Sequence, residues 1–367
     1  MACRILKSLG LLLALLALAA GCGGSDAPKA SDEEKVEKAL ADVEERLEDE
    51  GPLVGLGEAS PPPSDATAWE TDFSKHLVPL DEFQSGGPPK DGIPAIDIPH
   101  FTAAQQVDWI EDREPVISVT VGDETRGYPL QILTWHEIAN DELGGVPVAV
   151  TFCPLCNTAI VFDRRLHGEV LSFGTTGKLR DSDLVMYDRE TESWWQQFSG
   201  EALVGELAGA KLRQLPVRIV AWDEFRDEHP AGLVLDRDTG FSRDYGTNPY
   251  AGYDRIDSSP IFATRNEDDD RLLPKERVVY VEVSGDAFAV PFLALAKRRM
   301  IEIETDAGEL VVRWRGGVAS ALDEAAISAG RDVGAASVEL AGEPTPFSEP
   351  FWFAVAAFRA DVEIVDG

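Results

Sequence analysis

The sequence contains few residues that bind metals or carry out redox chemistry. Its 367 residues include four cysteines, five histidines and three methionines. It has no GxSxG, Walker A, GxGxxG or HExxH motif, and its CPLCN segment lacks the histidine of a c-type haem site. The common hydrolase, nucleotide-binding and c-type haem classes therefore have no support from motifs.

Basic residues are also scarce. The chain has 33 lysines and arginines against 66 aspartates and glutamates, a formal net charge of −33. Such a surface repels phosphate groups, which argues against binding to nucleic acid or to anionic lipid head groups.

No apolar run is long enough to span a bilayer comfortably, but the first 21 residues have the layout of a signal peptide. Arg4 and Lys7 precede the run LGLLLALLALAA, and small residues follow. The segment LAAGC, which ends at Cys22, resembles the bacterial lipobox, in which the cysteine carries the lipid. The alternative is an ordinary cleaved signal followed by a chance cysteine.

The lipobox interpretation places the protein in the cell envelope. Cys22 would anchor it to a membrane, and the rest of the chain would lie outside the cytoplasm, in the periplasm or on the outer surface. We expect residues 22–70 to form a tether with one amphipathic helix, and residues 71–367 to form the folded domain. Cleavage removes Cys3 and lipid occupies Cys22, so the mature chain keeps only two free cysteines, Cys153 and Cys156.

The domain pattern consists of short strands joined by turns. Residues 114–130 predict a hairpin around Gly122-Asp123, and residues 131–144 predict a helix closed by Gly144. A similar order of hairpin and helix recurs over residues 278–296. We therefore expect a β-rich α+β fold with two related halves packed as one unit, residues 71–255 and 256–367.

Four stretches resemble one protein family. They are GGPPKDGIPAIDIPHF, YPLQILTWHEIANDELGGVPVAVTFCPLCNTAIVFDR, FGTTGKLRDSDLVMYDRETESWWQQFSGEALVG and FWFAVAAF. On these residues the chain is identified as a member of the bacterial and archaeal family called domain of unknown function 3179. The resemblance implies a single fold unit and the importance of His136, Cys153 and Cys156, but it implies no reaction.

The pair Cys153 and Cys156 is the main candidate site. Apolar, β-branched runs flank it on both sides, so we expect it at a tight turn between two strands, where Pro154 fits. Such a knuckle can offer two thiolates to one metal ion. The same pair can instead cycle as a thiol-disulfide oxidoreductase, or form a disulfide that only locks a turn in a binding or scaffold protein.

Other side chains must complete a metal shell, because the mature chain has no second CxxC. His136 is the best placed of the five histidines, although a lone histidine often packs through hydrogen bonds instead. Met186 is a further candidate, against its commoner role in core packing. Thiolates, an imidazole and a thioether suit copper or zinc. Whether the protein is an enzyme, and which protein it meets, stay open.

Two aromatic patterns complete the candidates. Trp194 and Trp195 are neighbours in a predicted strand, so one should face the core and the other a groove. Three tyrosines in residues 243–254 predict either the lining of a cleft or a packed loop.

Overall fold

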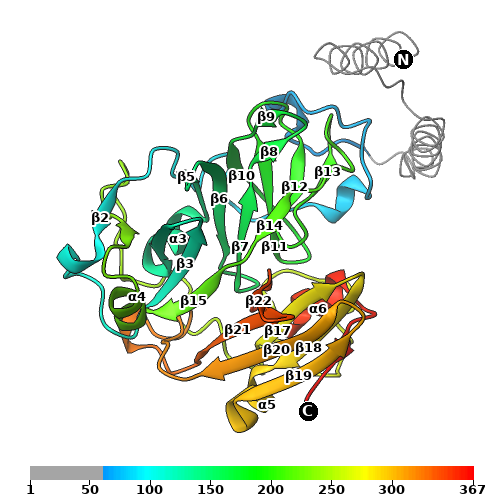
Figure 1. Cartoon of the computed structure of the whole chain (residues 1–367). Coiled ribbons are helices and arrows are strands. Elements are labelled where there is room, and N and C mark those ends of the chain that lie inside the picture. The colour runs from blue at the N-terminus through cyan, green and yellow to red at the C-terminus, as the bar shows by residue number, and fades with distance from the viewer. Residues whose placement is uncertain (1–60) are drawn as a thin grey trace, which may run out of the picture. The chain divides into compact units, whose positions relative to one another are not determined.

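The computed structural model describes residues 61–367, which are built mainly from short antiparallel strands (Figure 1). The leader, the Cys22 anchor and most of the expected tether lie outside the described residues. Within the described part, no helix has the length and apolar character needed to cross a membrane.

The strands form five sheets and one small ribbon (Figure 1). The first sheet has the order β1 (Gln84–Ser85), β10 (Phe173–Arg180), β11 (Asp183–Asp188), β12 (Trp194–Gln196) and β13 (Glu201–Val204). The second has the order β14 (Arg213–Leu215), β7 (Thr158–Asp163), β6 (Val146–Cys153) and β5 (Ile138–Leu143). The third has the order β15 (Arg218–Ala221), β3 (Pro115–Val121), β4 (Glu124–Pro129), β16 (Leu233–Leu235) and β2 (Phe101–Ala103).

The last two sheets come from the C-terminal part of the chain. The fourth has the order β17 (Val278–Val283), β18 (Asp286–Pro291) and β23 (Glu363–Ile364). The fifth has the order β19 (Met300–Thr305), β20 (Gly308–Arg315), β21 (Ala335–Leu340) and β22 (Glu343–Pro344), and the ribbon pairs β8 (Arg165–Leu166) with β9 (Glu169–Val170). The α-helices described are α3 (Leu130–His136), α4 (Trp222–Glu228), α5 (Phe292–Arg298) and α6 (Trp352–Phe358).

The predicted α+β class with two related halves is wrong. Each α-helix has only seven residues, and 13% of the described chain is helical. The small sheets are arranged as a five-bladed β-propeller. Three sheets come from the predicted first half and two from the second, so the sheets do not divide into two equal sets.

Both predicted hairpins are present, but the predicted helix after the first one is only half correct. β3 and β4 join at Gly122-Asp123, and β17 and β18 form the second hairpin. Helix α3 ends at His136, and β5 follows at once. Glu137, between them, has a φ of 59°, which a helix cannot continue through. Gly144 therefore closes a strand, β5, and not a helix.

The strands that carry the cysteine pair lie in the middle of the core. All residues of β7 and β11 are buried, as are the last six of β6, so these strands are covered on both faces. Trp194 and Trp195 are both completely buried, which corrects the expectation that one faces a groove. Trp194 packs edge-on against Trp69, and Trp195 packs edge-on against Phe173.

Candidate metal centre

Cys153 and Cys156 lie at a turn between strands, as the sequence predicted. β6 and β7 are antiparallel, with Cys153 paired to Thr158, and residues 154–157 make the connection. Asn157 has a φ of 58°, a left-handed conformation that asparagine tolerates better than most residues. The turn brings both sulfur atoms to the same side, and both cysteines are free thiols. A structural disulfide between them is therefore not observed.

Asp183, which the sequence analysis did not identify, faces this turn. It is the first residue of β11, after a two-residue hairpin turn in which both Asp181 and Ser182 have positive φ values, 53° and 58°. Such a turn matches the twist of the strands but is strained for residues other than glycine. Arg265 holds Asp181 through its backbone N–H (2.8 Å) and its guanidinium (2.6 and 2.9 Å), and Ser182 donates to the Phe262 carbonyl (2.9 Å). These contacts fix the position of Asp183.

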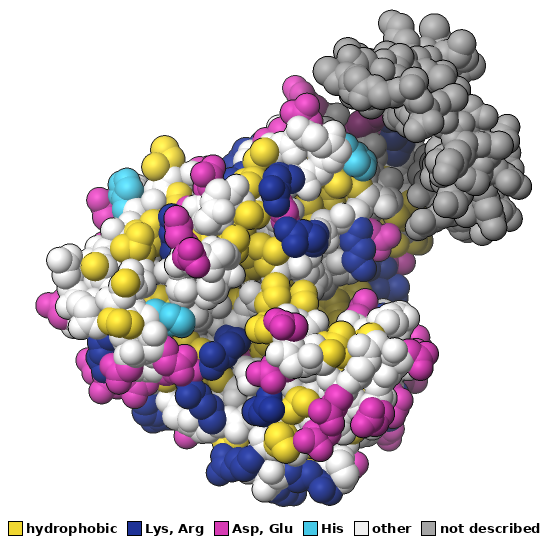
Figure 2. Space-filling view, in the orientation of Figure 1, with side chains coloured by type: hydrophobic (Ala, Val, Ile, Leu, Met, Phe, Trp, Pro, Cys, Tyr) yellow, Lys and Arg dark blue, Asp and Glu magenta, His cyan; other side chains and the backbone are white. Residues whose placement is uncertain are grey.

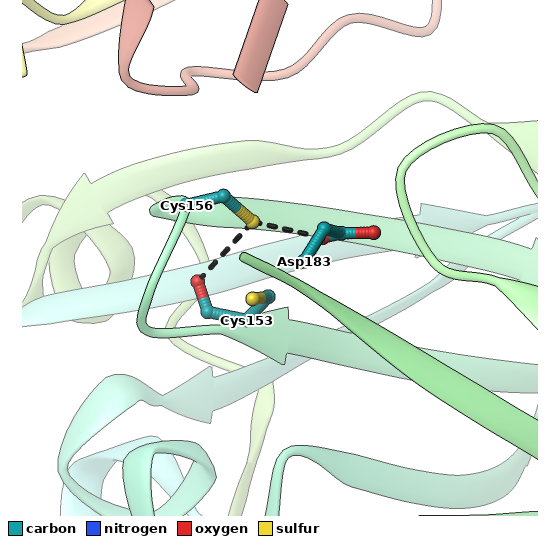
Figure 3. Close-up of side chains that lie close together, drawn as sticks. All are labelled: Cys153, Cys156 and Asp183. Atoms are coloured by element: carbon teal, nitrogen blue, oxygen red, sulfur yellow. Dashed lines mark hydrogen bonds between the residues drawn. The ribbon is translucent and has the colours of Figure 1, made fainter. Parts of the chain in front are cut away.

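The three side chains form one compact group (Figure 3). One ligand atom from each of Cys153, Cys156 and Asp183 lies within 4.8 Å of the others. The Cys156 Sγ donates to Asp183 Oδ1 at 2.9 Å. The three residues are 1%, 0% and 0% exposed, so the group is sealed from solvent. Among the described residues, this is the one cluster of metal-ligating side chains with this spacing.

Amide and hydroxyl groups hold the three side chains in place. Asp183 Oδ2 accepts from Gln196 Nε2 at 2.6 Å and from the Phe198 backbone N–H at 2.9 Å. Thr158 Oγ1 lies 2.9 Å from the Cys156 sulfur and donates to Gln197 Oε1 at 2.7 Å. The orientation of the carboxylate and of one sulfur is thus set by second-layer contacts, as is common around metal sites.

Burial raises the pKa of all three side chains of this group, and no ion pair with a basic side chain of the described residues offsets the effect. Burial raises the pKa of the Asp183 carboxyl to about 6, although hydrogen bonds from Cys156 and Gln196 act in the opposite direction. Burial also raises the pKa of both thiols, and the Asp183 carboxylate adds to each increase. Burial raises the pKa of nearby Glu137 to about 8, and Asp183 contributes. No basic side chain of the described residues hydrogen-bonds or ion-pairs with Cys153, Cys156 or Asp183.

His136 does not join the cysteines. Its Nδ1 lies 2.7 Å from the Pro94 carbonyl and its Nε2 lies 2.6 Å from the Tyr245 hydroxyl, so both ring nitrogens already have partners. It is also absent from the group of ligand atoms within 4.8 Å. The position of His136 therefore does not support its predicted role as a metal ligand. His136 is the last residue of α3, one residue before β5, the strand that pairs with β6.

Met186 packs in the main core and is completely buried. It follows Asp183 by three positions on β11, and side chains alternate between the faces of a strand. Met186 and Asp183 therefore point to opposite faces of β11, which fits the alternative of core packing.

The tyrosine loop and the C-terminal segment cover the cysteine turn. Tyr253 donates its hydroxyl to the Leu155 carbonyl at 2.9 Å, so the loop packs on the turn. The Phe351 backbone N–H donates to the Cys156 carbonyl at 2.9 Å, and Asn157 Nδ2 donates to the Glu349 carbonyl at 2.7 Å. The C-terminal apolar segment therefore packs back onto the turn that carries the cysteines.

Gln196 and Gln197 were visible in the sequence only as polar residues beside two tryptophans. Both amides are buried and both support the cysteine group, at 1% and 0% exposure. Two glutamines directly after two tryptophans in a predicted strand could have indicated a buried polar site nearby, since a buried amide needs hydrogen-bonding partners.

Comparison with known proteins places the chain in a family but gives no activity. No curated protein and no solved structure matches it. The family described as protein of unknown function (DUF3179) matches residues 90–362, which include the turn, Asp183 and both glutamines. The match spans well over half of the sequence, and the chain therefore belongs to the DUF3179 family.

Proposed function

We propose that this protein binds a metal ion, zinc foremost, through Cys153, Cys156 and Asp183. One observation carries the proposal: three acidic groups are buried side by side, and no basic side chain of the described residues hydrogen-bonds or ion-pairs with any of them. A buried acidic group must either stay protonated and neutral or have a positive partner for its negative charge. A bound cation would let all three groups ionise and would compensate their burial.

The donor types favour zinc over copper. Zinc accepts cysteine sulfur and carboxylate oxygen together, whereas Cu(I) prefers soft sulfur and imidazole ligands. The observed group of ligands includes Asp183 and neither His136 nor Met186, so it contains a hard oxygen donor. Three protein ligands leave one position of a tetrahedral zinc ion to be filled by a further group.

The environment of the cysteines argues against thiol-disulfide exchange. Exchange requires an accessible thiolate, and reactive cysteines usually have a lowered pKa. Here burial raises the pKa of both thiols, and both side chains are at most 1% exposed. These properties oppose a thiol-disulfide oxidoreductase, and the experiment on metal binding described next also tests for that activity.

The proposed metal site is tested by zinc titration of the reduced full-length protein against a chromogenic chelator. Cys153→Ser, Cys156→Ser and Asp183→Asn should each weaken zinc binding by more than the roughly 10- to 100-fold typical of changes outside the ligand shell. His136→Gln serves as the matched control, because it alters a nearby buried polar residue that is not in the group, and it should leave zinc affinity unchanged.

Circular dichroism of each variant separates loss of ligand from loss of fold. If the reduced wild type takes up neither Zn²⁺ nor Cu(I) at micromolar concentration, the metal proposal fails. Reversible cycling between dithiol and disulfide at a moderate potential in that same protein would then support the oxidoreductase alternative.

We also propose that the chain is exported and anchored through a lipid on Cys22, with the domain outside the cytoplasm. The support is the layout of residues 1–22 alone. The native protein should partition with membranes, and Cys22→Ser should block lipid attachment and cleavage before residue 22. Normal processing of this variant to a soluble product would contradict the anchor.

A further inference from the structure

A cleft of about 580 Å³ opens beside the cysteine group. One wall comes from β12, β13 and β14, and the other from β17 and the end of α6. Figure 2 shows the hollow between these two parts of the domain, with lysine and arginine side chains on its rim. Its volume is in the range of pockets that enclose small organic molecules, roughly 300–1,000 Å³.

Basic side chains outnumber acidic ones among the residues that line the cleft. Four basic side chains line it, and they are Arg180, Lys211, Arg265 and Arg359. Only two acidic side chains, Glu201 and Glu282, do so. The whole chain has twice as many acidic as basic residues. Arg180, Arg265 and Arg359 each pair with a carboxylate, from Glu82, Asp181 and Glu282 respectively. Lys211 forms no ion pair with any described residue, so it and the unused guanidinium N–H groups are the donors that the cleft can offer an anion.

Two of the guanidinium groups are positioned by other side chains and still have donors to offer. The Arg180 side chain is 7% exposed, and it donates from Nε to Glu82 (2.6 Å) and from Nη1 to Gln196 (3.3 Å). Arg265 donates from Nε and Nη2 to Asp181. The remaining nitrogens, Nη2 of Arg180 and Nη1 of Arg265, have no hydrogen-bonding partner among the described residues. Fixed, planar guanidinium donors suit carboxylate and phosphate oxygens.

Aromatic rings stand beside these donors. Phe198 and Phe358 are stacked with their centroids 4.7 Å apart, and Tyr280 lies 5.2 Å from Phe198. The guanidinium carbons of Arg180 and Arg265 are 5.8 and 5.9 Å from the centre of the Phe358 ring. Phe198 and Tyr280 are nearly buried, so the cleft places the half-buried Phe358 ring beside the guanidinium groups of Arg180 and Arg265.

We propose that this cleft binds a small organic anion that carries an aromatic ring. The carboxylate or phosphate group would accept from Arg180, Arg265 and Lys211, and the ring would pack against the half-buried Phe358, which Phe198 supports from behind. The proposal rests on the residues of the cleft and does not require a bound metal. The two sites are adjacent, because Gln196 lines the cleft and also donates to Asp183.

Calorimetric titration of the metal-free full-length protein tests the inference with four probes. Benzoate and phenyl phosphate carry both ring and charge, benzyl alcohol carries the ring alone, and inorganic phosphate carries the charge alone. We expect one or both aromatic anions to bind about tenfold or more tightly than benzyl alcohol and inorganic phosphate, which corresponds to one well-formed charged contact or ring contact. Equal binding of benzyl alcohol or of inorganic phosphate would overturn the assigned ligand class.

Two substitutions locate the binding. Lys211→Glu reverses an exposed charge on the rim, and Lys297→Glu makes the same change on α5, outside the cleft, as the matched control. Lys211→Glu should weaken binding of the aromatic anions about tenfold, and Lys297→Glu should not. Phe358→Leu should weaken them as well. The inference fails if no aromatic anion binds at millimolar concentration, or if affinity is the same in wild type, Lys211→Glu and Phe358→Leu.

Discussion

The side-chain amide of Gln196 connects the cysteine group to the cleft. Its Nε2 donates to Asp183, and its Oε1 accepts from Arg180. The residue is 1% exposed, so neither contact can be replaced easily by water. The carboxylate of the proposed metal centre and a guanidinium of the cleft therefore depend on the same side chain for their orientation.

This position gives a prediction about metal affinity. Gln196→Leu keeps the approximate volume but removes the donor to Asp183, so zinc binding should weaken by about 10- to 100-fold. Gln214→Leu is the control, since Gln214 also lines the cleft but makes no contact with Asp183. Chelator competition on both variants measures the difference. Equal losses in the two variants would show that Gln196 acts through the cleft or the fold, and not through Asp183.

At this scale the sequence predicted two of the three residues of the candidate site. Cys153 and Cys156 were found because their spacing is local, and a turn brings both to one side. Asp183 was missed because it lies 27 residues after Cys156 and reaches it only through packing between two sheets. His136 was proposed because it is close in sequence, but its hydrogen bonds to Pro94 and Tyr245 come from segments whose proximity no local pattern predicts.

Among the elements, the segment from Leu130 to Val146 shows how a short pattern can suit two structures. Ile132, Leu133 and His136 fit a helical period, and α3 uses it. After Glu137, the six residues of β5 pair with β6 across Gly144 and Gly145, whose φ values are 57° and 75°. A Gly-Gly pair between two apolar runs is a strong hairpin signal, and here it outweighs the helix end predicted at Gly144.

Strand existence was easier to predict than strand partnership. The hairpins β3–β4 and β17–β18 are confirmed because their turn residues are adjacent in the sequence. The parallel pairings of β16 with β4 and of β23 with β18 join segments far apart in the chain. Alternation of apolar residues marks a strand but does not identify its neighbour, so the arrangement of five sheets could not be derived from it.

For the whole molecule, stability should depend on pH through three buried carboxyls. Burial raises the pKa of Asp183 to about 6, of Glu349 to about 7 and of Glu137 to about 8. Between the ordinary carboxyl pKa and these values the folded state holds more protons than the unfolded state. The free energy of unfolding therefore falls as pH rises through this window, by up to ~1.4 kcal/mol for each unit of raised pKa.

The metal-free protein should accordingly be more stable at pH 5 than at pH 8, as measured by urea unfolding of the full-length chain. Glu137→Gln removes the group with the highest of the three pKa values, so it should flatten the decline between pH 6 and pH 8. A free energy of unfolding that rises from pH 5 to pH 8 would contradict the assignment. Zinc should oppose the decline, because it binds the ionised ligands and its affinity increases with pH.

The cysteine turn is closed by a segment that is synthesised after the three strands that hold Cys153, Cys156 and Asp183 in place. Asn157 and the Glu349 carbonyl that it contacts are 192 residues apart, and Phe351 then covers Cys156. β6, β7 and β11 are therefore complete before the segment that seals them exists, and an ion has its most direct path to the sulfur atoms during that interval. In the finished protein, an ion at the proposed site would be released on this side when the segment lifts away from the turn. A stretch of chain that supplies no ligand would thus determine how long the metal stays bound.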